Sequence, residues 1–251
     1  MPLQVKNGFP CLFILLLFYG HGFAQQVNQF DDQGNRNGKW EKYYKGTDQL
    51  RYEGTFKHGR ETGTFKFYEP DSGDQPRATK TYQPGNDTVV LKFFNSDGIL
   101  KSQGTMVDKK REGEWNYYNG GKENLVMTEH YKNDKLEGWK IIYFSNGKIT
   151  QKLHYKNGMK DGVKLVFRKN GKPWQKYHYV RDTLQGDTKT FDRNGEIESE
   201  GHYKKGLRNG KWSFYTDGKL DSIATYKMDR LSVNQKKARR KKEENNKKKS
   251  E

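Results

Sequence analysis

The chain has 251 residues, of which only 31% are hydrophobic, and Tyr, Phe and Trp make up nearly half of that hydrophobic fraction. A compact α/β enzyme builds its core from Leu, Ile, Val and Ala, so this composition argues against such an enzyme. The 27 glycines favour many short strands joined by tight turns, with flat rings covering a thin sheet. The formal net charge is +17, and residues 25–230 alone carry +10, so the body of the chain is basic.

Residues 1–24 are predicted to be a secretory signal peptide. Lys6 gives a weakly positive start, an apolar run extends from Cys11 to Tyr19, and small residues precede a predicted cleavage site after Ala24. The run is shorter than the about 20 residues that a membrane-spanning helix needs, and a buried strand is the alternative. Because Cys11 opens the run, it is not placed as a lipoprotein cysteine. Cleavage leaves a mature chain without cysteine, predicted to be secreted or to lie in the periplasm or cell envelope.

Two markers recur along residues 25–230 with a common period of about 24 residues, which is the pattern of a repeat array. One marker is the glycine before an aromatic strand, and the other is an apolar residue near the end of each copy. The glycines are Gly38, Gly63, Gly113, Gly138, Gly162, Gly186 and Gly210. The apolar residues are Phe56, Tyr82, Met106, Tyr131, Tyr155, Tyr179, Tyr203 and Tyr226. A degenerate third copy is predicted where Thr88 replaces the glycine.

Within a copy, the pattern predicts two strands and two turns. Trp139, Ile141 and Tyr143 alternate onto one face of a strand, and Val163/Leu165/Phe167 and Val89/Leu91/Phe93 are expected to repeat that parity. A second strand, such as residues 150–155, runs into a further turn. Asn-Gly and Asp-Gly pairs after the first strand are predicted to form type I′ turns. These pairs are Asp97-Gly98, Asn146-Gly147, Asn170-Gly171, Asn194-Gly195 and Asp217-Gly218.

The predicted fold is therefore all-β: an elongated, twisted antiparallel sheet of about eight tandem β-hairpin repeats. Residues 25–230 form this array, between the signal peptide and a basic tail at residues 231–251 that is predicted to be disordered. A lone hairpin is marginally stable in water, so each copy is expected to depend on its neighbours.

The segments 38–44, 113–118 and 210–215 share the cadence G-x-W-x-x-Y, and other copies contain N-G-K, at 146–148 and 170–172, and Y-K-x-G, at 155–158 and 203–206. This cadence resembles MORN repeats, and more closely the bacterial MORN-variant family, whose members are described as antitoxin-like. The resemblance covers residues 30–230. It implies an elongated antiparallel sheet with a scaffolding or binding role, and no catalytic residue. The third copy departs from it at Thr88, and the seventh has Thr188 where Trp or Phe is usual.

Four histidines recur every 24 residues, each directly before the tyrosine of its copy: His130, His154, His178 and His202. Equivalent residues of successive hairpins lie two strands apart, about 10 Å, whereas the donors of a shared zinc ion all lie about 2 Å from it. We therefore predict a polar repeat position and no metal site or cofactor.

The sequence offers little support for an enzyme. Glu198 and Glu200 share a strand face, but acid–base catalysis also needs a pocket that shifts one pKa, and an open sheet provides little desolvation. No nucleophile elbow, phosphate loop or zinc-protease motif occurs. The prediction is a non-enzyme, and an enzyme acting on envelope polymers is the remote alternative.

Trp40, Trp115, Trp139 and Trp212 are predicted to occupy the core position of their copies. Trp174 breaks this register, because its parity matches that of Lys176 and His178. An aromatic ring on a mostly polar face, beside a cation, is typical of a partner contact. We therefore predict a partner-binding site at Trp174, Lys176 and His178. Packing of Trp174 over a strand end or an adjacent turn is the alternative.

The tail contains a run of basic residues that is predicted to bind anionic surfaces such as lipid head groups or lipopolysaccharide. These residues are Lys236, Lys237, Arg239, Arg240, Lys241 and Lys242. A solvated tail without a specific ligand is the alternative, and no specific nucleic acid is expected.

The sequence as a whole predicts an exported binding or scaffold module for a protein partner or an anionic envelope surface. An antitoxin or immunity-like protein is the alternative that the resemblance suggests. The oligomeric state is left open.

Overall fold

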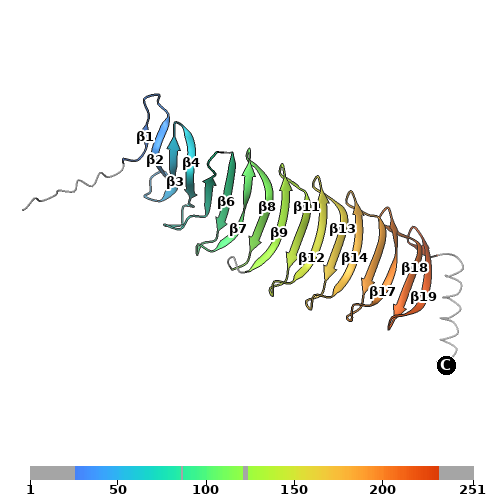
Figure 1. The fold of residues 1–251 in the computed structure, drawn as a ribbon. Helices are drawn as coiled ribbons and strands as arrows, with labels where there is room; N and C mark the ends of the chain where they lie inside the picture. Colours follow the sequence, from blue (N-terminus) through green and yellow to red (C-terminus); the bar gives the residue numbers. More distant parts are fainter. Residues whose placement is uncertain (1–25, 86, 121–123, 232–251) are drawn as a thin grey trace, which may run out of the picture.

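The computed structural model describes residues 26–85, 87–120 and 124–231. Within these residues the chain is all-β, and its strands form one antiparallel sheet (Figure 1). No helix in the described part is long and apolar enough to cross a membrane. The predicted fold class is confirmed.

The strands follow in chain order and mostly contain five to ten residues. They are β1 (Gln29–Phe30), β2 (Arg36–Tyr43), β3 (Leu50–Lys57), β4 (Arg60–Phe67), β5 (Ala78–Tyr82), β6 (Thr88–Phe94), β7 (Leu100–Val107), β8 (Lys110–Tyr118), β9 (Leu125–Lys132), β10 (Lys135–Leu136), β11 (Gly138–Tyr143), β12 (Ile149–Lys156), β13 (Met159–Phe167), β14 (Pro173–Val180), β15 (Thr183–Leu184), β16 (Gly186–Phe191), β17 (Ile197–Lys204), β18 (Leu207–Thr216), β19 (Lys219–Lys227) and β20 (Arg230–Leu231).

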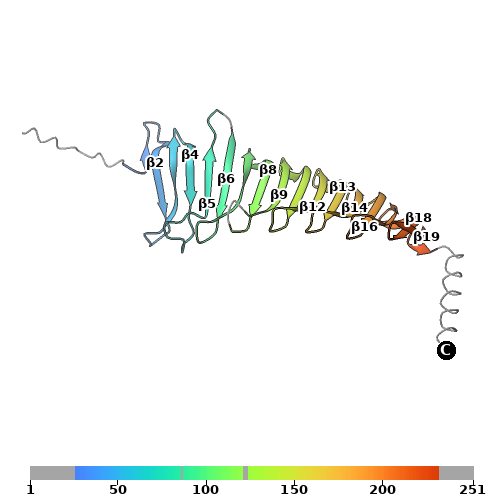
Figure 2. The same ribbon diagram turned by 60° about the horizontal axis from the view of Figure 1, so that its bottom comes forward.

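Each strand pairs with its neighbours in sequence. The two-residue strands β10 and β15 are short stretches before β11 and β16, which themselves pair with β9 and β14. Figures 1 and 2 show the result, a single elongated layer that twists along its length. No second layer covers either face of the described sheet, so side chains on both faces reach solvent.

The repeat glycine is required by a bulge at the junction between copies. Between β7 and β8 the pairing changes from Gly104 with Trp115 to Thr105 with Glu112, so two residues of β8 are left unpaired. One of them is Gly113, whose φ is 69°. Side chains disfavour such positive φ values, which explains why glycine recurs here.

The third copy lacks this bulge. Pairing of β6 with β5 is continuous, and Val89 pairs with Met106 as Gly113 pairs with Tyr131. The residue that replaces the glycine is therefore Val89, and the prediction of Thr88 was wrong by one position. Without the bulge no positive φ is needed, so a β-branched residue is tolerated.

The two faces of the sheet are distinguished by the residues that end each copy. We call them the tyrosine face, which carries the apolar repeat markers from Phe56 to Tyr226, and the histidine face, which carries His130, His154, His178 and His202. Register places Val89 opposite Tyr82, on the tyrosine face, and Val163 opposite His178, on the histidine face. The predicted common parity of these two strands was wrong, because a bulge shifts one strand and not the other.

On the tyrosine face, large rings lie over glycines of the preceding strand. A Cβ atom built on Gly54 would lie 2.3 Å from the Phe65 ring, and one built on Gly201 would lie 2.2 Å from the Trp212 ring. Trp115 lies over Gly104 in the same way. Phe65, Trp115 and Trp212 are buried, so these ring–glycine pairs form the core of a sheet that is one layer thick.

Trp139 does not belong to this core. It directly follows Gly138, whereas Trp40, Trp115 and Trp212 lie two residues after their glycines. Trp139 therefore pairs with His154 on the histidine face, where its ring meets the imidazole edge-on at 5.1 Å and stays 37% exposed. The prediction that all four tryptophans are equivalent was wrong.

The turns are predicted correctly in position and only partly in type. In the turn after β11, Phe144 N donates to Lys148 O and Gly147 N donates to Phe144 O, and only Gly147 has positive φ. This is a three-residue loop that ends in a bulge glycine, and not a type I′ turn. The two-residue turns with positive φ at both positions lie mostly between copies. They are His58-Gly59, Asp108-Lys109, Asn133-Asp134, Asn157-Gly158, Arg181-Asp182, Lys205-Gly206, Asp217-Gly218 and Met228-Asp229.

Candidate functional site

The positive charge of the repeat array is confined to one part of it. Residues 138–181, which include β11 to β14, contain eleven Lys or Arg and a single acid, Asp161, for a net charge of +10. Residues 26–137 contain eighteen basic and eighteen acidic residues, and residues 182–231 contain nine of each. We call residues 138–181 the basic segment.

The cations of the basic segment are mostly without carboxylate partners. Lys140 pairs with Glu129 at 2.7 Å, and no other Lys or Arg of the segment forms an ion pair within the described residues. Several reach backbone carbonyls of the next copy: Lys148 Nζ lies 3.4 Å from Asn170 O, and Lys172 Nζ lies 2.8 Å from Asn194 O. The segment therefore presents uncompensated charge to solvent.

The three predicted partner-binding residues lie in a row on β14. Trp174, Lys176 and His178 are exposed, and they alternate with less exposed residues, as expected for one face of a strand. Trp174 is 41% exposed. The row faces solvent on the histidine face, within the basic segment.

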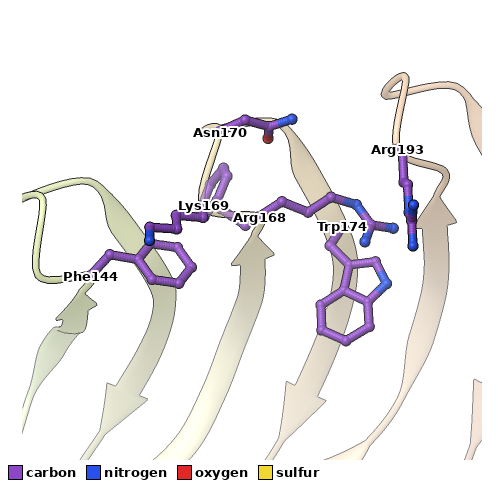
Figure 3. A pocket seen from close by; sticks show the side chains of 7 residues that line it. Phe144, Arg168, Lys169, Asn170, Trp174 and Arg193 are labelled. Carbon is purple, nitrogen blue, oxygen red and sulfur yellow. The ribbon is translucent and has the colours of Figure 1, made fainter.

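Trp174 also borders a shallow, open hollow at the turns after β11, β13 and β16 (Figure 3). The Arg168 guanidinium lies 5.1 Å from the centre of the Trp174 ring and donates to Phe191 O at 2.9 Å. Phe144 and Arg193 line the hollow on either side. Trp174 thus covers an adjacent turn, as the alternative predicts, and also remains exposed; its role in partner binding stays a prediction.

The sequence prediction missed Arg168 and Arg193, because both are turn residues at positions where the repeat pattern has no fixed residue type. Arg168 stands where other copies have residues as different as Tyr44 and Phe144. The available signal was the near absence of acids over residues 138–181, which a count of charge for the whole chain conceals.

Three of the four repeat histidines contact backbone carbonyls at the bulges, whereas His202 Nδ1 lies 2.9 Å from Asp187 Oδ1. His154 Nδ1 lies 2.8 Å from Asp161 O, His178 Nδ1 lies 3.1 Å from Gln185 O, and His130 Nδ1 lies 3.1 Å from Trp139 O. These carbonyls lie next to the bulge glycines, where the ladder of backbone hydrogen bonds is interrupted. No group of three potential metal ligands gathers anywhere in the described part of the chain.

The paired acids Glu198 and Glu200 lie on the open sheet. Glu200 accepts a hydrogen bond from the Tyr215 hydroxyl at 2.8 Å and pairs with Lys189 at 3.0 Å. The Tyr215 hydrogen bond and then that of Lys189 lower the pKa of Glu200, whereas a general acid needs a raised pKa.

Residues 1–24 and the basic residues from Lys236 to Lys242 lie outside the described residues.

The fold defines a class, the tandem β-hairpin repeat protein. A family model described as MORN repeat variant matches residues 140–157, 184–205 and 208–228, which correspond to β11–β12, β15–β17 and β18–β19. The resemblance to MORN repeats is confirmed for these copies. MORN repeats are in general non-catalytic modules that often serve in binding. No protein with a curated description matches the chain.

Proposed function

We propose that this chain is an exported, non-catalytic binding module that holds an anionic partner, a protein or an envelope surface, against its basic segment. The observation that carries the proposal is the localisation of the array's entire net charge in residues 138–181. Copies that served only to extend the sheet would have no reason to differ in this way, because the flanking copies balance their charges.

The histidine face of the basic segment suits such a partner. Exposed Trp139 and Trp174 provide apolar area, and Lys176 provides charge beside it. Aromatic residues, together with cationic residues such as Arg, contribute much of the binding energy at protein interfaces. The antitoxin-like role that the resemblance implies stays a prediction, since no contact of the described residues bears on it.

The test compares two triple variants with equal loss of charge. Lys156, Lys169 and Lys176 are exposed and without ion pairs in the basic segment, and they are replaced by Gln. The control replaces three exposed lysines of residues 26–137, which we call the neutral half, in the same way, namely Lys42, Lys57 and Lys101. Binding of the mature chain to anionic vesicles is measured by co-sedimentation, and an envelope extract is screened with each variant as bait.

We expect the variant of the basic segment to bind vesicles more weakly than the control variant does, or to lose one specific protein that the control variant retains. If both variants bind like the unaltered chain, or lose binding equally, the basic segment has no special role and the proposal fails.

A further inference from the structure

Lys164 occupies a position that the other copies fill differently. Two residues after the repeat glycine, or after its counterpart Val89, the side chain points to the tyrosine face and packs against the preceding strand. The occupants of this position are Trp40, Phe65, Leu91, Trp115, Lys140, Lys164, Thr188 and Trp212. Five of the eight copies thus carry an apolar side chain here.

The two other polar occupants have partners. Lys140 pairs with Glu129, which also accepts a hydrogen bond from the Tyr131 hydroxyl at 2.6 Å. The Thr188 hydroxyl donates to Lys176 O at 2.8 Å. Lys164 has neither an ion pair nor a hydrogen bond within the described residues. Its register partners are Leu153 and Tyr177, so it is a half-buried cation without a counter-charge.

A second cation lies on the same face of the same strand. Lys160 Nζ lies 5.6 Å from the Tyr179 ring centre, and Lys164 Nζ lies 6.0 Å from that of Tyr177. Burial lowers the pKa of the Lys164 ammonium, and Lys160 lowers it further. An unpaired cation close to a second cation is a site where binding of an anion is most favourable, because the anion supplies the missing counter-charge.

The surroundings specify the kind of anion. By register, the strands β12, β13 and β14 place no carboxylate on the tyrosine face. The residues that they place there are Gln151, Leu153, Tyr155, Lys160, Lys164, Val166, Gln175, Tyr177 and Tyr179. The Asp182 carboxylate, in the turn after β14, accepts a hydrogen bond from the Lys160 backbone N at 2.9 Å and forms no ion pair with either lysine ammonium within the described residues. Two ammonium groups with amide and hydroxyl donors match an oxyanion that carries about two negative charges, as a phosphate does at neutral pH.

We propose that Lys160 and Lys164 form a binding site for a phosphate group on the tyrosine face. The site lies on the face opposite Trp174, Lys176 and His178, so it does not depend on the binding role proposed above. Neither lysine is altered in the triple variants described there, and the two proposals fail separately.

The test follows the lysine signals by NMR in the mature chain with ¹³C-labelled lysine. Sodium phosphate is compared with sodium acetate at equal ionic strength, and the Lys164 signal is assigned with Lys164→Met. We expect phosphate, and not acetate, to raise the pKa of Lys164, because a bound dianion favours the protonated amine. If phosphate leaves Lys164 unchanged, the proposal is overturned.

The variant Leu153→Glu copies the internal pairing of Lys140 with Glu129. We expect it to raise the pKa of Lys164 without phosphate and to weaken phosphate binding at least about tenfold. Leu153→Gln is the matched neutral control and should keep the response. If Leu153→Glu does not fold, Lys164→Met tests the same point, since loss of the ammonium should abolish the phosphate effect on Lys160. Retention of that effect would contradict the site.

Long-chain polyphosphate separates two sources of the phosphate group. An equal response per phosphate group supports a small ligand, and a response at much lower concentration supports a phosphorylated polymer. The site is overturned if the polymer acts equally on Lys164 and on exposed lysines of the neutral half, such as Lys57.

Discussion

At the scale of single residues, the sheet is stabilised where a large side chain meets a residue with no side chain. Trp212 lies over Gly201, and Trp115 lies over Gly104. In the fifth copy, where Lys140 replaces the ring, the opposing position holds Glu129 instead of glycine. In these copies the two positions vary together, as a ring over glycine or as an ion pair. The sixth copy, with Lys164 opposite Leu153, has neither arrangement.

Replacing Gly201 with Ala should destabilise the protein by about 1–3 kcal/mol, because the added methyl group would overlap the Trp212 ring. Urea denaturation followed by circular dichroism measures the loss. In a Trp212→Leu background the same substitution should cost clearly less, since the smaller side chain leaves room. Equal costs in both backgrounds would show that the ring does not rest on Gly201.

Lys140→Met should destabilise the protein by about 3 kcal/mol at neutral pH, because it leaves the Glu129 carboxylate buried and unpaired. Burial raises the pKa of Glu129, but hydrogen bonds from Lys140 and Tyr131 lower it by more, so the net pKa lies below its ordinary 4.5. The contribution of this ion pair to the free energy of unfolding is therefore lost as pH falls through the folded pKa of Glu129.

The variant should behave in the opposite way. Without Lys140 the folded pKa of Glu129 rises above its unfolded value, so acid relieves the loss. Urea denaturation at pH 7 and pH 4.5 should show a smaller difference between variant and parent at the lower pH. Lys189→Met, which breaks an exposed pair with Glu200, is the control and should cost less than about 1 kcal/mol.

At the scale of the strand, the sequence predicted the repeats well and the faces poorly. Period and turn positions follow from glycines and tyrosines, and these markers are local. The face of a residue depends on bulges, each of which shifts the pairing between neighbouring strands. The common face predicted for Val89, Trp139 and Val163 was wrong for this reason, since alternation within a strand cannot reveal the register of its neighbour. The exposure of Trp174 could be predicted because Trp174, Lys176 and His178 alternate along a single strand, so no register with a neighbouring strand was needed.

Gly162→Ala should destabilise the protein by about 1–2 kcal/mol, because Gly162 has a φ of 113° and a Cβ atom would lie 3.2 Å from the His154 Cβ. Gly210→Ala is the matched comparison. Its φ is 79° and no atom lies within 4 Å of the built Cβ, so it should cost less. Thermal denaturation ranks the two. A neutral Gly162→Ala would remove the bulge explanation of the repeat glycine.

At the scale of the whole molecule, stability and charge are distributed differently. Stability arises from contacts between neighbouring strands along the entire sheet, as in other repeat proteins. Charge is concentrated in the copies formed by β11 to β14, and the copies on either side are neutral. Changes to surface charge in the basic segment should therefore alter binding with little effect on folding.

The same reasoning applies to the tail, residues 232–251, which truncation after Leu231 removes and whose net charge is +6. Basic residues near an anionic membrane contribute about 1 kcal/mol each, so removal of residues 232–251 should weaken binding to anionic vesicles at least about tenfold at low salt. The loss should shrink as salt screens the charges. Thermal stability should stay unchanged, because the described strands pair among themselves. Unchanged vesicle binding would leave the tail without its predicted role, and a lower melting temperature would show that it also stabilises the end of the sheet.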